Sequence, residues 1–293
     1  MSLPSVRDGA VIAASVVGFF LSLATVAQAQ GVSVAPSRIL LDGRTRSATV
    51  FLSNRGNRTE TYRISLVPML MREDGALVRA DSTQHEQAQF AEGTVRYSPR
   101  RVVIPAGGSQ TVRLLVRRPH DLEEDDVEFR AHLSVCSIPL VPRLEELESP
   151  IPEDIPSDQF VAVPVASVET LVPLVVRFGK PKATVKIADP QLARHDNGKL
   201  YLGFDLLREG RRSLYGKLLV RHIDPAGQET QVYLGRGIAL YTPNQRRIFR
   251  IPCDEFAADL GNGRVVIDYI ETPNGGGDQK AQATIMPQVT SRK

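Results

Sequence analysis

The chain has 293 residues, a length that suggests two domains, and 42% of them are hydrophobic while 24% are charged, as in ordinary soluble globular proteins. Its 36 basic and 33 acidic residues leave a net charge of +3, which is too balanced to favour a nucleic-acid-binding protein. The histidines and cysteines show no metal-ligand spacing, and there is no tryptophan for stacking on sugars. The composition therefore favours neither a metal site nor a carbohydrate-binding surface.

Residues 1–29 have the pattern of a cleavable signal peptide. Arg7 supplies a weakly positive start, an apolar run covers 9–26, and 27–29 (AQA) form a small-x-small cleavage site before Gln30. An uncleaved membrane anchor is the less favoured alternative, because the apolar run is only marginally long enough to cross a bilayer. We therefore predict export and a mature chain that begins at Gln30.

From Gly31 onward, short segments of alternating apolar and polar residues are separated by turn signals. Segment 47–54 reads SATVFLSN, and the turn at 105–108 (PAGG) begins with proline and ends in two glycines that tolerate positive φ. Such a succession of short strands and turns predicts an all-β sandwich. Cys136 and Cys253 fall in two of these strand patterns in different domains, where cysteines are usually small buried hydrophobic residues, so we expect no disulfide between them.

A proline-rich, acidic loop is predicted at 140–159, and the most apolar run of the mature chain follows it at 160–179. That run has the composition of a strand, because valine recurs in it. Pro164 and Pro173 lie inside it, and proline cannot donate to a ladder, so we predict an edge strand or a bulge. An open apolar edge strand is a means of binding another chain.

The segment 179–182 (GKPK) is predicted to be a linker, after which the strand pattern starts again. Seven predicted strands in the remaining part match a second sandwich. The predicted organisation is a signal peptide at 1–29, an N-terminal domain at 30–178 and a C-terminal domain at 181–293.

Several motifs resemble the periplasmic pilus-assembly chaperones, the PapD-like family. The first two strand segments, VSVAPSRILLDG and SATVFLSN, look like the family's first two strands, and SVCSIP resembles its penultimate strand with the closing Ile138-Pro139. The stretch RYSPRRVVIPAGGSQTVRLLV is similar to the family signature, whose members fall on Pro99, Pro105, Gly107, Gln110 and Arg113. The resemblance covers 30–179 well and the second domain more loosely.

The resemblance implies a fold and a function. The fold is two immunoglobulin-like sandwiches in a boomerang arrangement. The function is that of a periplasmic chaperone, without cofactor or catalysis, which lends a strand to pilin-like subunits lacking their final strand and delivers them to an outer-membrane usher. Such a protein would not bind nucleic acid, and two free copies could cap each other's donor strands as a dimer.

The resemblance also implies roles for individual residues. Arg38 is expected to bind the subunit's C-terminal carboxylate in the cleft between the domains, because a guanidinium pairs bidentately with a carboxylate. Arg177 is expected to take part in an interdomain ionic cluster. The residues predicted to fill the subunit's groove are Val161, Val163, Val165, Val168 and Leu171.

The chain departs from the family pattern at three points. Pro173 stands where the family has a second anchoring lysine, and Ser137 stands where it has the acidic partner of Arg177. Counting back from Arg177 would instead place Ala162, Pro164, Ala166 and Val168 on the donor face. We favour the valines at 161–165, because alanine and proline fill a groove poorly.

Two other functions stay open on the sequence. One is a β-sandwich binding module of another surface-assembly system, which the missing lysine keeps in view. The other, less favoured, is a secreted hydrolase, since the chain has no nucleophile elbow, zinc-type spacing or close carboxylate pair in a turn.

Overall fold

The computed structural model describes residues 31–81, 90–91, 93–120, 122, 125–139, 166–194, 198–253, 263–286 and 290–291. The predicted signal peptide and the predicted donor residues Val161, Val163 and Val165 lie outside these ranges. The described chain consists of β-strands and one short 3-10 helix, η4 (Pro273–Gly275). The predicted all-β class is therefore confirmed. No helix in the described ranges is long and apolar enough to cross a membrane.

Two sheets form an N-terminal sandwich. One sheet has the order β1 (Val32–Ala35), β3 (Ser47–Asn54), β9 (Ser109–Val116), β7 (Val95–Ser98). The other has the order β2 (Ile39–Leu41), β11 (Glu169–Phe178), β10 (Val127–Ile138), β4 (Glu60–Val67), β8 (Arg101–Ile104). Alternate side chains of each strand point into the shared core, so that in β3 Val50 and Leu52 are buried while Phe51 is 57% exposed.

The strand β11 is open along part of one edge. It pairs with β10 over its whole length without a register shift, from Phe178 opposite Val127 to Glu169 opposite Cys136. On its other side, β2 covers only residues 174–176, in a parallel pairing. No other described strand pairs with this second edge along residues 169–173, which include Pro173. The predicted edge strand is confirmed for this part, and the alternative of a bulge is excluded there.

A second pair of sheets forms a C-terminal sandwich. One sheet has the order β16 (Arg246–Pro252), β13 (Leu200–Gly210), β12 (Ala183–Arg194), β19 (Thr290–Ser291). The other has the order β15 (Glu229–Leu240), β14 (Leu214–Ile223), β17 (Arg264–Glu271), β18 (Lys280–Ile285). The core between them includes Leu218, Tyr269 and a stacked pair, Phe204 and Phe249, whose ring centroids are 5.0 Å apart. Cys253 is buried in this core while Cys136 lies on β10, and the two do not form the disulfide whose absence the sequence predicted.

A hairpin of the N-terminal half bridges the two sandwiches. It consists of β5 (Met69–Met71) and β6 (Leu77–Arg79). Met71 is buried in the C-terminal core, and the carbonyl oxygen of Glu73 accepts a hydrogen bond of 2.7 Å from the backbone N–H of Ile248. At the base of the hairpin, Arg79 forms an ion pair of 2.6 Å with Glu169 at the start of β11. The hairpin thus connects the open edge strand with the second sandwich.

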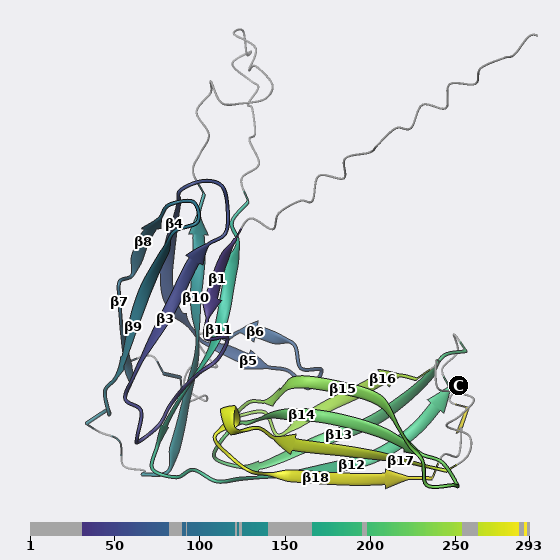
Figure 1. The fold of residues 1–293 in the computed structure, drawn as a ribbon. Coiled ribbons are helices and arrows are strands. Elements are labelled where there is room, and N and C mark those ends of the chain that lie inside the picture. Colours follow the sequence, from purple (N-terminus) through teal and green to yellow (C-terminus); the bar gives the residue numbers. More distant parts are fainter. Residues whose placement is uncertain are drawn as a thin grey trace, which may run out of the picture.

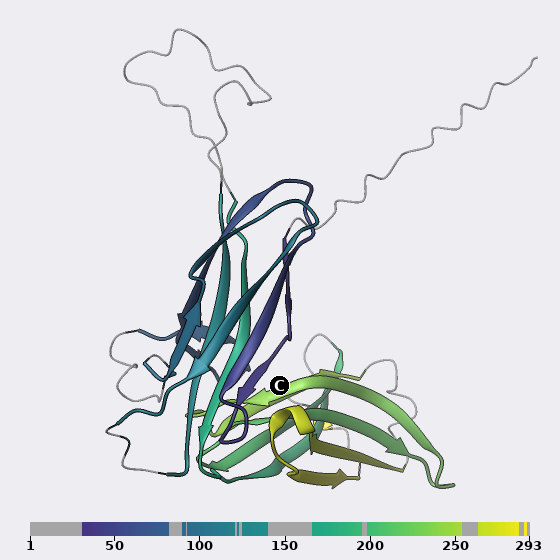
Figure 2. The same ribbon diagram turned by 60° about the vertical axis from the view of Figure 1, so that its left-hand side comes forward.

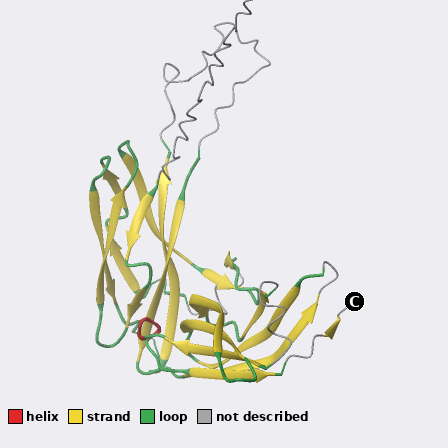
Figure 3. Cartoon of the chain, turned by 45° about the vertical axis from the view of Figure 1, so that its right-hand side comes forward, coloured by secondary structure: helices red, strands yellow, loops and turns green. Residues whose placement is uncertain are grey.

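The two sandwiches meet at one end, with their strands running in different directions, so the molecule has the boomerang shape that the resemblance implies (Figures 1, 2 and 3). The connection between them turns at Gly179, whose φ is +65°. A Cβ at Gly179 would overlap the carbonyl oxygen of Asp125 and the carboxylate of Asp126. Only glycine fits this turn without strain.

Candidate functional site at the domain junction

The face of β10 that points away from the N-terminal core is polar and yet buried. Glu128, Arg130, His132 and Ser134 alternate along this face, and each is at most 3% exposed. Leu133, on the opposite face, belongs to the N-terminal core. A polar strand face of this kind normally contacts water. Here Glu128 and Arg130 have hydrogen-bond partners in the C-terminal sandwich, Arg130 has a further one in the β5–β6 hairpin, and Ser134 bonds Glu169 of the neighbouring strand β11. This face forms the floor of the junction.

Arg38, the predicted carboxylate anchor, lies directly before β2 and reaches across the junction to two tyrosines of the C-terminal sandwich. Its Nη1 donates a hydrogen bond of 3.1 Å to the Tyr241 hydroxyl, and its Cζ lies 4.3 Å from the ring centroid of Tyr215. Stacking on an aromatic ring attracts the cation and restricts its rotation. The guanidinium is therefore held at the domain junction by residues that the sequence motifs did not single out.

Arg130 lies on the other side of Tyr241. Its Cζ is 4.5 Å from the ring centroid, and its Nη2 donates hydrogen bonds to the carbonyl oxygens of Thr242, at 2.6 Å, and of Met69, at 3.2 Å. Burial lowers the pKa of Arg130 to about 10; the negative charge of Glu128 opposes this shift, and the positive charge of Arg38 adds to it. Arg130 still carries its charge at neutral pH.

His132 is the next residue along the same face, and its ring meets that of Tyr241 edge to face with centroids 6.1 Å apart. Neither ring nitrogen has a hydrogen-bond partner among the described residues. Burial, with further contributions from the charges of Arg130 and Arg38, lowers the pKa of His132 to about 4. The imidazole is therefore neutral at pH 7, and it adds no charge to the cleft.

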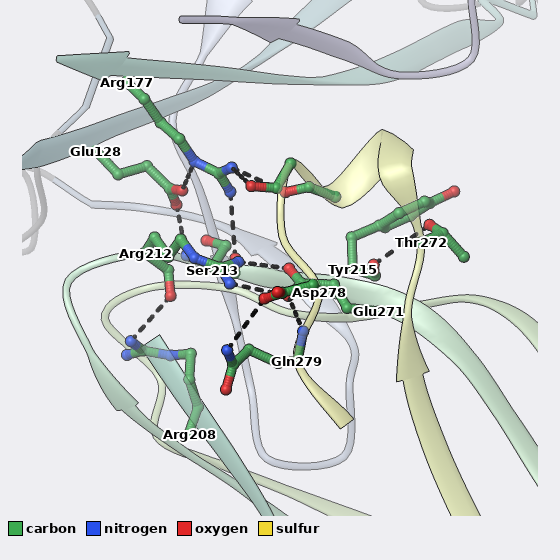
Figure 4. Close-up of polar contacts among 12 residues, drawn as sticks. Glu128, Arg177, Arg208, Arg212, Ser213, Tyr215, Glu271, Thr272, Asp278 and Gln279 are labelled. Atoms are coloured by element: carbon green, nitrogen blue, oxygen red, sulfur yellow. Dashed lines mark hydrogen bonds and ion pairs between the residues drawn. The ribbon is translucent and has the colours of Figure 1, made fainter. Parts of the chain in front are cut away.

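Arg177, the predicted interdomain residue, lies at the centre of a buried network (Figure 4). Its Nε donates a hydrogen bond of 2.8 Å to Glu128, and its Nη1 donates to the carbonyl oxygens of Gly275, at 2.8 Å, and Gly276, at 3.3 Å. The other carboxylate oxygen of Glu128 accepts the backbone N–H of Ser213 at 2.9 Å. Both members of this ion pair of the N-terminal sandwich thus also bond the backbone of the C-terminal sandwich.

A second buried ion pair, Arg212 with Glu271, lies below the first one in the view of Figure 4. Burial alone would lower the pKa of Arg212, but the hydrogen bonds and the charge of Glu271 raise it overall. Glu271 also accepts the backbone N–H of Gln279 at 3.1 Å, which ties it to the turn after η4. Arg208 extends the network by donating to the Arg212 carbonyl oxygen at 3.2 Å. The carboxylates of Glu128 and Glu271 are thus paired with Arg177 and Arg212, and the two ion pairs hold the junction together.

The acidic partner of Arg177 could not be located from the family pattern, because Ser137 stands in the expected place. The register of β10 with β11 places Glu128 directly opposite Arg177. The one available signal was the alternation of Glu128, Arg130 and His132 in a strand whose other face is apolar. That pattern identifies a polar face, but it does not reveal that a second domain covers it.

The two described donor candidates lie on opposite faces of the chain. Leu171 is half-buried, on the same face of β11 as Arg177, whereas Val168 follows the alternation of the core residue Val172 and is 48% exposed. The backbone N–H of Val168 is bonded to the Ser137 hydroxyl at 2.8 Å. The five predicted donor residues therefore cannot all lie on one face of an uninterrupted strand.

In the described ranges, no three histidine, cysteine, aspartate or glutamate side chains are grouped so that they could hold a metal ion. Lys180 and Lys182, the two lysines of the predicted linker, line a cavity of about 660 Å³ together with Asp42 and Asp278. Arg38 is not among the residues that line this cavity. The two lysines are therefore not part of the Arg38 cleft.

No family model and no curated protein matches the chain. Solved structures to which it is similar include the YadV chaperone (13% identity, 87% of this chain, 99% of that chain, TM-score 0.43). The CupB2 chaperone of Pseudomonas aeruginosa is similar at 13% identity, over 87% of this chain and 100% of that one, with a TM-score of 0.41. The structure of the Salmonella enterica SafA pilin in complex with the SafB chaperone is similar at 14% identity, over 87% of this chain and 97% of that one, with a TM-score of 0.41. These values are too low to carry an argument about function, which is argued below from the residues.

Proposed function

We propose that this chain is a periplasmic chaperone that binds pilin-like subunits lacking a final strand and passes them to an outer-membrane usher. It would act by binding and not by catalysis. The observation that supports the proposal best is the register around Arg38. Ile39, the first residue of β2, pairs with Leu174, so Arg38 is level with Pro173. At this point the pairing with β2 stops, and the open edge of β11 extends from Pro173 back to Glu169.

We propose that a bound strand has the same direction as β2, parallel to β11. A client strand that continues the line of β2 along residues 169–173 and runs parallel to β11 has its C-terminal end beside Arg38. Its backbone would complete the ladder, and its carboxylate would meet a guanidinium that Tyr215 and Tyr241 already hold in place. The ordering cost of a flexible arginine is thereby reduced before binding. A β-sandwich module of another surface-assembly system would use the same geometry, and the client decides between the two.

The anchor is tested by co-expressing the chain with pilin-like subunits encoded beside its gene and measuring the one-to-one complex. We expect Arg38→Ala to weaken the complex by at least about 100-fold, because truncating one partner of a desolvated charge pair costs about 2–5 kcal/mol. Arg46→Ala, which changes an exposed arginine of the same sandwich, should bind like the parent protein. An unchanged yield with Arg38→Ala, or the absence of any pilin-like client, would contradict the proposal.

The donor face is tested with two matched charges. We propose that the face of Val163 fills the client's groove, so Val163→Asp should abolish the complex because a carboxylate would be buried unpaired. Val168→Asp places the same charge on the opposite face and should leave most of the binding in place. Both variants should keep the melting temperature of the free protein, measured by circular dichroism. If only Val168→Asp lost binding, the proposed donor face would be wrong, and the even-numbered residues would fill the client's groove.

A further inference from the structure

The cleft contains a second permanent cation that the family pattern does not predict. Arg130 is 3% exposed, and its hydrogen bonds go to the carbonyl oxygens of Met69 and Thr242 and to the Thr242 hydroxyl, all of which are uncharged. No carboxylate of the described residues forms an ion pair with it. Burying a cation among neutral acceptors is costly, and a bound anion nearby reduces that cost.

The neighbouring charged groups offset Arg130 only in part. Glu128 lies two residues away on β10, and its negative charge favours the charged form of Arg130, but its two carboxylate oxygens accept hydrogen bonds from Arg177 and from the backbone of Ser213. His132, two residues away in the other direction, is neutral at pH 7 because burial lowers its pKa to about 4. Arg130 is therefore a buried cation beside Tyr241 without an ion-pair partner among the described residues.

Arg130 and Arg38 are connected by Tyr241. Arg38 donates a hydrogen bond to the Tyr241 hydroxyl, and Arg130 lies over the same ring. Both guanidinium carbons are less than 6 Å from this ring's centroid, at 5.8 Å for Arg38 and 4.5 Å for Arg130. Burial raises the pKa of Tyr241, so its hydroxyl remains protonated between the two cations.

We propose that Arg130 is the second cation of the carboxylate anchor, acting from beneath Tyr241 in place of the lysine whose position is taken by Pro173. This inference rests on the proposed function. Arg130 does not touch the client; it strengthens the potential at Arg38 through a low-dielectric contact, and Tyr241 is the positioning residue between them. Arg130 is close enough in the sheet to take over the role of a lysine at position 173. Pro173 pairs with His132 on β10, and Arg130 is two residues from His132 on the same strand.

The test uses two synthetic heptapeptides of alternating threonine and valine, one with a free C-terminal carboxylate and one with a C-terminal amide. The quantity measured is the ratio of their affinities for the mature chain. We expect the parent protein to prefer the free acid and Arg38→Ala to lose the preference. Arg130→Met should reduce the ratio about tenfold, the size expected for one charge at about 10 Å in a partly buried site. Arg130→Lys should restore it.

Arg208→Met is the matched control. Arg208 is also 3% exposed, and its hydrogen bonds also go to backbone carbonyl oxygens, so its loss should destabilise the fold in a similar way. Its charge does not act through the Tyr241 ring, so Arg208→Met should change the acid-to-amide ratio much less than Arg130→Met does. Arg130→Gln, which keeps an amide donor for Thr242, replaces Arg130→Met if the latter does not fold. An unchanged ratio in a folded, neutral Arg130 variant overturns this inference and leaves the Arg38 anchor intact. If the parent protein binds the two peptides equally, or binds neither, both the role of Arg130 and the Arg38 anchor are wrong.

Discussion

Replacing Arg177 with leucine is expected to lower the free energy of unfolding by about 3–5 kcal/mol, because it leaves a buried carboxylate without its cation. Glu128 is 0% exposed in its side chain, and its oxygen lies 2.8 Å from the Arg177 Nε. The substitution also removes the donors to the carbonyl oxygens of Gly275, Gly276 and Ser213. The measurement is urea-induced unfolding followed by far-ultraviolet circular dichroism.

Two variants make this result specific to the buried pair. Arg118→Leu breaks an exposed pair with Asp125, whose side chains are 44% and 88% exposed, and should cost less than about 1 kcal/mol. The double variant Arg177→Leu with Glu128→Leu should recover part of the loss, because no unpaired charge is then buried. If Arg177→Leu cost no more than Arg118→Leu, the pair would not be holding the junction together.

Lowering the pH from 6.5 to 4 is expected to remove about 3 kcal/mol of stability through His132 alone. The pKa of His132 is about 4 in the folded protein, because of burial and then the charges of Arg130 and Arg38, against 6.5 for an ordinary histidine. Below pH 6.5 the unfolded chain takes up a proton that the folded chain does not accept until about pH 4. Protonation therefore stabilises the unfolded state over this pH window. Above pH 6.5 His132 is neutral in both states and takes nothing from the stability of the fold.

The measurement is the free energy of unfolding as a function of pH for the parent protein and for His132→Phe. Phenylalanine keeps an aromatic contact with Tyr241 and cannot titrate, so the variant should lose this slope between pH 6.5 and 4. His120→Phe, which changes an exposed histidine, should follow the parent protein. Equal slopes in the parent and His132→Phe would show that His132 does not stay neutral in the fold.

Much of the strand pattern could be predicted from local signals. SATVFLSN and the turn at 105–108 became β3 and the connection of β8 to β9, because alternation and turn residues act over a few positions. The prolines of the apolar run indicated an edge, and Pro173 does lie where β11 is open. Arg38 could be selected only through its motif, since nothing in its local sequence distinguishes it from a surface arginine.

The supporting residues of the site could not be predicted in the same way. Tyr215 and Tyr241 lie about two hundred residues from Arg38 in the chain, and no local pattern connects them with it. Glu128 was missed because its partner depends on the register of β10 with β11, which local signals leave open. The packing of Met71 from the β5–β6 hairpin into the other sandwich has no local signal either.

The sequence by itself determined that this protein is all-β, that its strands divide into two sandwiches around a linker, and that one apolar strand has an open edge. These properties follow from side-chain alternation and turn chemistry, which are local. Only the tertiary structure decided the environment of Glu128, Arg130 and His132. In the sequence they form one polar face of a strand, which is what a solvated surface also presents. The C-terminal sandwich covers that face and removes water from it, and the resulting burial pairs Glu128 with Arg177, keeps His132 neutral and leaves the charge of Arg130 beneath the cleft.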